Sequence, residues 1–328
     1  MFSVLRGSFR VPSFIFHATP NDKTFNGYGH IMSAATIYNM KQSPKNPHLA
    51  TGDASGRIAI WNLTSGAPVA FTWQTNPVRA MAQLPYNKLA TADGRCVRIW
   101  KSARLNSTLE SSAPEESPRE GLREGLRESI REGLCESLRE SPRDVIGLVA
   151  LPHGRLAVAT AHDVRIWDTI RGKPVMTINS CGALIAALPN NTLASYCPQE
   201  KKVRIFHTES GARLQVIPTG RVEAMTSLPN GTLATISDRL ALWNVHTGAC
   251  LASKFVDSII MHQRMTSSAG NYILSNTRTS HFSVFDGKSL KTRELCAVRQ
   301  DPAQHLLSLP DGRILTIDVQ SLVQVWGG

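Results

Sequence analysis

Val164–Asp168 reads Val-Arg-Ile-Trp-Asp, a short strand-like stretch that closes on an aromatic residue. Stretches of this form occur seven times along the chain. They are Ile58–Trp61, Val97–Trp100, Val164–Trp167, Val203–Phe206, Leu240–Trp243, Phe282–Phe285 and Val323–Trp326. The closing aromatics are 39, 67, 39, 37, 42 and 41 residues apart, so one period near 40 residues repeats with a single long interval. A period of this length predicts a repeat architecture.

A second element precedes most of these aromatic strands. It turns at Pro, Asn or Gly and continues into small and branched apolar residues, which is typical of an antiparallel hairpin. A polar turn with Gly and a further apolar run follow the aromatic, as in Ser65-Gly66 before Pro68–Trp73. The pattern therefore predicts four antiparallel strands in each repeat. The hairpin elements are Leu84–Thr91, Leu151–Thr160, Leu188–Ser195, Leu228–Thr235 and Leu309–Thr316, with looser versions at Ser43–Thr51 and Ser268–Ser275.

The repeats resemble the WD-repeat family of β-propellers, whose four-stranded blades end in a Trp-Asp-like pair. Trp167-Asp168 keeps this dipeptide, whereas Trp61-Asn62 and Trp243-Asn244 carry the amide. The resemblance covers nearly the whole chain. It implies an all-β fold, in which residues 1–328 form a single seven-bladed propeller of four-stranded antiparallel blades. Its blades would close near Trp61, Trp100, Trp167, Phe206, Trp243, Phe285 and Trp326.

The same resemblance implies structural roles for two sets of residues. One set is the closing tryptophans, Trp61, Trp100, Trp167, Trp243 and Trp326. The other corresponds to the strand-linking aspartate of the family and consists of Asp53, Asp93, Asp163, Asp238 and Asp318. The Gly-His pair that joins this aspartate in many blades of the family occurs only at Gly29-His30. The repeats are thus degenerate, and the sixth, Met265–Phe285, has neither the aspartate nor the tryptophan.

The ends of the chain predict how the ring closes. Only Gly327 and Gly328 follow Trp326, so the last blade is expected to take its outermost strand from the N-terminal region. Such a strand removes the exposed sheet edges that an open ring presents. Either Arg10–His17 or Tyr28–Ser33 could supply it.

The long interval between Trp100 and Trp167 contains a charged insert at residues 111–143. From Arg119 to Pro142 it repeats a tetrapeptide of the Arg-Glu-Gly-Leu type, and its glycines disfavour a stable helix. The insert is either an expanded simple repeat without function or a helix that binds a partner. The stretch 110–144 has six Arg and ten Asp or Glu, a net charge of −4. Because the whole chain has a net charge of +11, the residues outside this stretch carry +15.

The sequence has none of the usual catalytic motifs. It contains no GxxxxGK[ST], GxSxG or HExxH pattern, and its ten histidines are dispersed without a pair at metal-ligand spacing. The six cysteines include no CxxC pair. A propeller enzyme would place carboxylates or histidines around the central channel, but the innermost strands read as Ala, Val, Met and Leu. We therefore expect no enzymatic activity, no cofactor and no metal site.

The lengths and charges of the apolar segments indicate where in the cell the protein is located. The longest of them, such as Ser258–Met261, is far shorter than the roughly 18 residues that cross a bilayer. Met1–Phe16 carries Arg6 and Arg10 in its apolar part, which disfavours a secretory signal. We expect a cytoplasmic protein without a membrane partner.

Two kinds of partner are expected, one implied by the resemblance and the other by the positive charge. Proteins that resemble the WD-repeat family mostly hold a protein or peptide on the narrow top face, at times within a larger complex, and the matching positions here are Arg79, Arg221, Glu223, Gln304 and Arg143-Asp144. The alternative is electrostatic binding of nucleic acid or another polyanion. Arg98, Arg165 and Arg204 share one strand position, which predicts either a row of phosphate ligands or long side chains that pack beside the closing aromatic.

Overall fold

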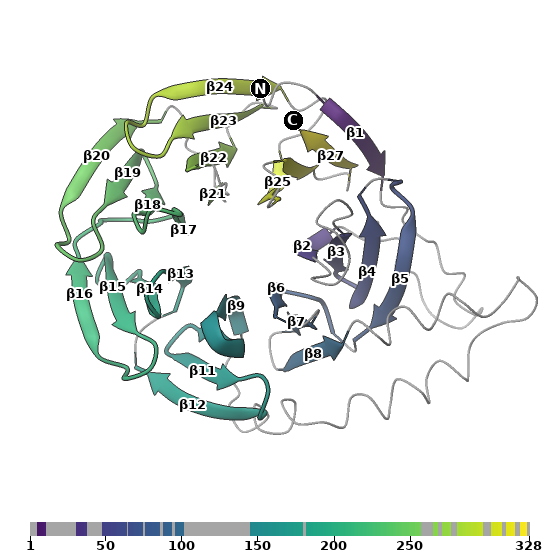
Figure 1. Cartoon of the computed structure of the whole chain (residues 1–328), viewed down its shortest axis with the longest axis horizontal. Coiled ribbons are helices and arrows are strands. Elements are labelled where there is room, and N and C mark those ends of the chain that lie inside the picture. Colours follow the sequence, from purple (N-terminus) through teal and green to yellow (C-terminus); the bar gives the residue numbers. More distant parts are fainter. Residues whose placement is uncertain are drawn as a thin grey trace, which may run out of the picture.

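The computed structural model describes residues 5–10, 31–37, 48–63, 65–74, 76–85, 88–93, 96–101, 145–179, 182–256, 265–267, 271–276, 281–297, 303–309, 313–318 and 322–326. These residues form seven small antiparallel sheets arranged in a ring (Figure 1). The prediction of an all-β, seven-bladed propeller is confirmed. The charged insert at residues 111–143, Gly29-His30 and Arg143-Asp144 lie outside the described residues.

Each blade is a sheet whose strands follow one another from the centre of the ring outward. Blade 1 consists of β2 (Ile31–Ile37), β3 (His48–Asp53), β4 (Arg57–Asn62) and β5 (Pro68–Trp73), and blade 2 of β6 (Ala80–Leu84), β7 (Lys88–Ala92) and β8 (Val97–Lys101). Blade 3 consists of β9 (Val145–Leu151), β10 (Arg155–Thr160), β11 (Val164–Asp168) and β12 (Lys173–Ile178). Blade 4 consists of β13 (Leu184–Leu188), β14 (Thr192–Cys197), β15 (Lys202–His207) and β16 (Arg213–Ile217). Among the described residues, blade 2 has three strands, because its β8 is followed by the undescribed stretch.

The other three blades complete the ring. They are blade 5, with β17 (Ala224–Ser227), β18 (Leu233–Ile236), β19 (Arg239–Trp243) and β20 (Cys250–Phe255); blade 6, with β21 (Met265–Ser267), β22 (Tyr272–Asn276), β23 (His281–Asp286) and β24 (Thr292–Ala297); and blade 7, with β25 (Ala303–Ser308), β26 (Ile314–Asp318), β27 (Leu322–Trp326) and β1 (Leu5–Arg10).

The N-terminal strand β1 closes the ring. It pairs antiparallel with β27, with Arg10 opposite Leu322 and Phe9 opposite Val323, and so forms the outermost strand of blade 7 (Figure 1). An N-terminal closing strand is therefore confirmed, but both segments named for it were wrong. Tyr28–Ser33 fails because its last residues belong to β2, which pairs with β3 as the innermost strand of blade 1. Arg10–His17 begins where β1 already ends.

The two faces of the disc are defined by the turns. We call top face the end that carries the loops between second and third strands and the linkers from one blade to the next. The bottom face carries the turns between first and second strands and between third and fourth strands. A short 3-10 turn, Pro152–Gly154, lies on the bottom face of blade 3.

The apolar core lies between neighbouring blades. Trp100 of β8 packs in one cluster with Ile58 of blade 1, and Phe206 of β15 packs with Ile166 of blade 3. Strand alternation produces this arrangement, because one side of each sheet faces the preceding blade and the other faces the next. Complete burial of one such large side chain stabilises the fold by about 1.5–3 kcal/mol.

Serine side chains add polar links between blades 5, 6 and 7. The hydroxyl of Ser267 donates to the carbonyl oxygen of Ser227 at 2.6 Å, and that of Ser308 donates to the carbonyl oxygen of Ser267 at 2.6 Å. All three serines end the innermost strand of their blade. Neighbouring blades are thus joined at the wall of the central channel as well as through their cores.

The residue after the closing aromatic caps the turn that follows it. Its side-chain oxygen accepts hydrogen bonds from backbone N–H groups of that turn. Asn62 accepts from Ser65, Asp168 from Ile170 and Arg171, Asn244 from His246 and Thr247, and Asp286 from Lys288 and Ser289. Since only an acceptor oxygen is needed, Asp and Asn replace each other at this position.

The same turns show why glycine recurs in them. Gly66, Gly172, Gly211 and Gly248 have positive φ, and each donates its N–H to the carbonyl of the capping residue. Blade 6 has Leu290 at this position, with φ of 55° and the matching hydrogen bond to Asp286. The Leu290 side chain is buried in a core cluster with residues of blade 5. Apolar packing thus holds a leucine in a conformation that glycine adopts without strain.

None of the helices among the described residues is long and apolar enough to span a membrane.

Candidate functional site

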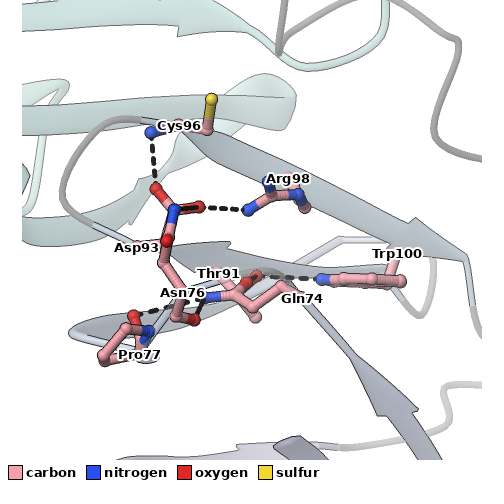
Figure 2. Close-up of polar contacts among 8 residues, drawn as sticks. All are labelled: Gln74, Asn76, Pro77, Thr91, Asp93, Cys96, Arg98 and Trp100. Carbon is pink, nitrogen blue, oxygen red and sulfur yellow. Dashed lines mark hydrogen bonds and ion pairs between the residues drawn. The ribbon is translucent and has the colours of Figure 1, made fainter. Parts of the chain in front are cut away.

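A polar network at the top of blade 2 fixes the linker that leads to Arg79 (Figure 2). The Trp100 indole donates to Thr91 Oγ1 at 2.9 Å, and the Thr91 hydroxyl donates to Gln74 Oε1 at 2.8 Å. Gln74 Nε2 in turn donates to the backbone oxygens of Asn76 and Pro77 at 3.2 and 3.4 Å. One chain of hydrogen bonds thus runs from the core of blade 2 to the linker from blade 1.

A carboxylate completes this network. The Asp93 side chain accepts hydrogen bonds from the Cys96 N–H at 2.8 Å, from Asn76 Nδ2 at 3.2 Å and from Arg98 Nη1 at 2.6 Å (Figure 2). Asn76 therefore joins the linker to the loop between β7 and β8. Arg79 follows this linker directly, is exposed, and donates its backbone N–H to Ala92 O at 2.8 Å.

Arg221 and Glu223 lie in the linker from blade 4 to blade 5. Arg221 Nη2 is 3.1 Å from Glu223 Oε1, and the Arg221 side chain is 75% exposed whereas that of Glu223 is 16% exposed. Glu223 Oε2 is buried and has no hydrogen-bond partner among the described residues. The buried Tyr196 hydroxyl accepts the N–H of the intervening Val222 at 3.1 Å, which fixes the linker from below.

The predicted partner-binding residues share the top face but occupy different blades. Arg79 and Glu223 hold equivalent positions, since each donates its N–H to the second strand of its own blade just before the innermost strand begins. Blades 3 and 4 separate them around the ring (Figure 1). The backbone of Gln304 lies in β25, at a register shift between Ala303 and His305. The structure thus brings Arg221 and Glu223 together, but not Arg79 with either.

The arginines of the aromatic strands contact carboxylates of their own blades. Arg98 pairs with Asp93, Arg165 Nη2 lies 3.2 Å from Asp163 Oδ2, and Arg204 pairs with Glu200. Arg57 Nε is likewise 3.0 Å from Asp53 Oδ2. These side chains are largely enclosed. Their charge is balanced within the blade, which does not favour a row of phosphate ligands.

The predicted strand-linking aspartates differ in their surroundings. Asp53, Asp93 and Asp163 are buried, and the Asp163 carboxylate also accepts the Thr160 hydroxyl at 2.5 Å. Asp238 is exposed, and the hydroxyl of Ser237 donates to it at 2.7 Å, which lowers the pKa of the Asp238 carboxyl. Asp318 ends β26, and its side chain lies outside the described residues.

The closing tryptophans share a partner that the sequence analysis missed. The indole Nε1 of four of them donates to a threonine hydroxyl on the second strand of the same blade, in the pairs Trp61–Thr51, Trp100–Thr91, Trp243–Thr235 and Trp326–Thr316, at 2.8–2.9 Å. In blade 3 the Trp167 Nε1 is buried without a hydrogen-bond partner among the described residues. Recurrence of Leu-Ala-Thr in the hairpin elements was a signal for this contact.

A groove on the bottom face was also missed. It lies between blades 4 and 5 and has a volume of about 260 Å³. Its walls come from the hairpin turns of both blades, the turn after β19, and Leu251 of β20. The lining residues are Pro189, Asn190, Thr192, Pro229, Asn230, Gly231, Thr232, Asn244, Val245, His246 and Leu251. No pattern along the chain indicates a groove whose two walls come from separate repeats.

Within the described ranges, no group of three or more His, Cys, Asp or Glu side chains could hold a metal ion. In comparisons with known proteins, the chain matches no family model and no curated relative.

Proposed function

We propose that this protein is a non-enzymatic scaffold that binds a protein or peptide partner through the loops of its propeller, and that its blades are degenerate WD repeats. The fold supports this proposal, because a rigid ring offers two loop-covered faces for binding. The tryptophan–threonine contacts and the capped turns after Trp61, Trp167, Trp243 and Phe285 support the assignment of the repeats. A cytoplasmic location belongs to the same proposal.

The Arg221–Glu223 pair is the observation that carries the proposal. An exposed guanidinium held by one carboxylate oxygen keeps donors for a second acceptor, and Arg guanidinium forms bidentate contacts with carboxylates. Tyr196 and the hydrogen bond to Ile236 hold this linker in place, so the charged groups are presented by a fixed backbone. Pre-ordered groups lose less entropy when a partner binds. The partner is therefore expected to present acidic groups to Arg221 and, across the ring, to Arg79.

Affinity purification from the native cell type tests the top-face assignment. We would use about 0.3 M salt, where screening shortens the Debye length to a few ångströms. The intact chain is compared with a double variant that carries both Arg79→Glu and Arg221→Glu, and with a chain that lacks Pro114–Pro142. A protein partner retained by the intact and shortened chains but lost from the double variant supports the proposal.

Arg171 provides the matched control. It is exposed, pairs with Asp168 at 3.3 Å, and lies on the bottom face. Arg171→Glu makes one of the same Arg-to-Glu charge reversals on the opposite face, so it is expected to retain the partner. Equal loss from Arg171→Glu and from the top-face variant would contradict a top-face site.

Polyanion binding is the second candidate, and the net charge of +15 outside residues 110–144 favours it. Binding of this kind depends on counterion release and weakens steeply between about 50 and 200 mM salt. A labelled DNA or RNA oligonucleotide therefore separates the two candidates. If the oligonucleotide is the sole ligand recovered, and only at low salt, the scaffold proposal fails.

A further inference from the structure

The groove between blades 4 and 5 lies on the bottom face, opposite the site proposed above, and nothing in the top-face argument uses it. Pro189, Pro229 and Leu251 give it apolar walls, and Leu251 is 55% exposed. Leu251 is the extra residue of a β-bulge, since the register between β19 and β20 passes from Ala252 to Cys250. A bulge turns a side chain away from the regular face of its strand. An aliphatic side chain is therefore presented to solvent at the outer end of the groove.

The polar lining of the groove is rich in donors. Asn230 Oδ1 accepts the N–H of Thr232 at 3.0 Å, and Asn244 Oδ1 accepts the N–H groups of His246 and Thr247. These carbonyl oxygens are engaged inside their own turns, so the part of each amide still available is the NH₂ group, which only donates. The lining therefore suits a ligand rich in acceptors, such as the backbone carbonyls and carboxylates of an extended peptide.

The carboxylates of the bottom face lie beside arginines, and further exposed cations remain near the groove. All three carboxylates described on the bottom face, those of Asp168, Glu209 and Asp286, lie 3.3–3.6 Å from an arginine. Exposed cations remain on blade 4, at Arg213, and on the turn of blade 6, at Lys288 and Lys291. Blade 4 and blade 6 flank blade 5 on either side (Figure 1). The groove thus lies between two positively charged rims.

The outer strand of blade 4 adjoins the groove as well. Gln215 Nε2 donates to the carbonyl oxygen of His246, a lining residue, at 3.0 Å. Arg213 lies two residues before Gln215 at the start of β16. The hydrogen bond fixes the turn of blade 5 against the strand that carries this cation.

We propose that this groove binds an extended acidic peptide segment of a partner protein, with one aliphatic side chain seated between the prolines and Leu251. The peptide carbonyls accept from the asparagine amides, and its carboxylates lie near Arg213 on one side and Lys288 and Lys291 on the other. The propeller so provides two independent docking faces, one at the top and one at the bottom.

Selection from a phage-displayed library of random peptides, with the full chain as bait, tests the proposal. The selected peptides are expected to combine acidic residues with one aliphatic residue, and a labelled synthetic peptide of the selected sequence then measures affinity. Leu251→Glu places a negative charge at the groove and is expected to weaken this peptide by roughly tenfold or more. Asn244→Asp keeps the cap of the turn but removes the amide donor, so it too is expected to weaken binding.

Two matched variants serve as controls. Val175 is the bulged residue of β12 in blade 3, is 42% exposed, and does not line the groove, so Val175→Glu repeats the charge change elsewhere on the same face. Asn62 caps the corresponding turn of blade 1, so Asn62→Asp repeats the amide-to-acid change. Both controls are expected to bind the peptide nearly as the parent does.

Three outcomes would overturn the proposal. One is a selection without enrichment of acidic residues. Another is equal weakening by Leu251→Glu and Val175→Glu, which would indicate a general electrostatic surface. The third is unchanged affinity in Leu251→Glu and Asn244→Asp, which would place the peptide elsewhere. Because the Arg79 and Arg221 variants leave this face intact, failure here is distinguishable from failure of the top-face proposal.

Discussion

Val158 takes, beside Trp167, the place that a threonine holds beside the closing tryptophan of blades 1, 2, 5 and 7. Trp167 is opposite Leu156 in the register of β10 and β11, and Val158 follows two residues later. In blade 2 the same spacing leads from Leu89, opposite Trp100, to Thr91. A buried donor left without an acceptor costs about 1–3 kcal/mol.

Val158→Thr is therefore expected to stabilise the protein by about 1 kcal/mol, because its hydroxyl can accept from the Trp167 indole. Chemical denaturation at equilibrium measures the change. Val203→Thr is the control, since Val203 is also fully buried and packs in an apolar cluster, and there the buried hydroxyl is expected to destabilise. Destabilisation of equal size in both variants would contradict the role assigned to Val158.

The cap of the turn in blade 3 yields a second prediction. Asp168→Asn is expected to leave the stability within about 0.5 kcal/mol, because Asn62 and Asn244 cap the same turn in other blades. Asp168→Ala removes the acceptor for two backbone N–H groups and is expected to cost about 1 kcal/mol. Thermal melting of the two variants checks the difference, and similar melting temperatures would contradict it.

The corresponding aspartate of blade 6 makes stability depend on pH. The backbone N–H of Ser289, then its hydroxyl and the N–H of Lys288, lower the pKa of Asp286 from 3.8 to about 2. Because the folded pKa is the lower one, this contribution is fully present above pH 3.8 and is lost as the pH falls toward 2. Asp286→Asn is expected to remove it. Denaturation at several pH values then shows a smaller loss of stability on acidification in the variant than in the parent.

At Leu290, backbone strain and side-chain burial have opposite effects on the stability of the fold. Leu290→Gly relieves a positive φ, which is worth about 1 kcal/mol, but removes a side chain whose burial contributes about 2–3 kcal/mol. We expect a net loss of about 1–2 kcal/mol in equilibrium denaturation. Gly248→Leu at the equivalent turn is expected to be destabilising as well, since the turn of blade 5 offers close contact to Gln215 but no core cluster. Stabilisation by Leu290→Gly would show that strain outweighs packing.

Closure by β1 yields the last prediction. Removal of Leu5–Arg10 exposes the edge of β27 and takes away the main-chain pairing of blade 7. The shortened chain is expected to melt at a lower temperature and to self-associate, as measured by calorimetry and light scattering. Addition of a synthetic peptide of the sequence Leu5–Arg10 is expected to reverse part of the loss, and a scrambled peptide is not.

The sequence predicted the ring well because each repeat is a local unit. The spacing of the closing aromatics and the hairpin elements reflects strands that are neighbours along the chain, as β6, β7 and β8 are. The choice of closing strand was wrong because that pairing joins Arg10 to Leu322, with no local pattern to mark it.

The polar contacts between repeats were harder to predict for the same reason. Gln74 follows blade 1 in the sequence but accepts a hydrogen bond from Thr91 of blade 2, and no sequence pattern marks this contact. The arginine position was recognised, yet its ion pairs depend on acids in loops of varying length, as with Asp93 and Asp163. The groove depends on side chains of two blades at once.

The serine links of blades 5, 6 and 7 have a mechanical consequence. The hydroxyls of Ser267 and Ser308 each donate to a carbonyl oxygen of the preceding blade, so the two hydrogen bonds run in the same rotational sense around the channel. When a pulling force separates two of these blades, the hydrogen bond at the channel wall must break together with the apolar contact behind it. Blades 5, 6 and 7 are therefore expected to separate together under force. Blade 6, whose β21 has only three residues, is then held by its neighbours on both sides.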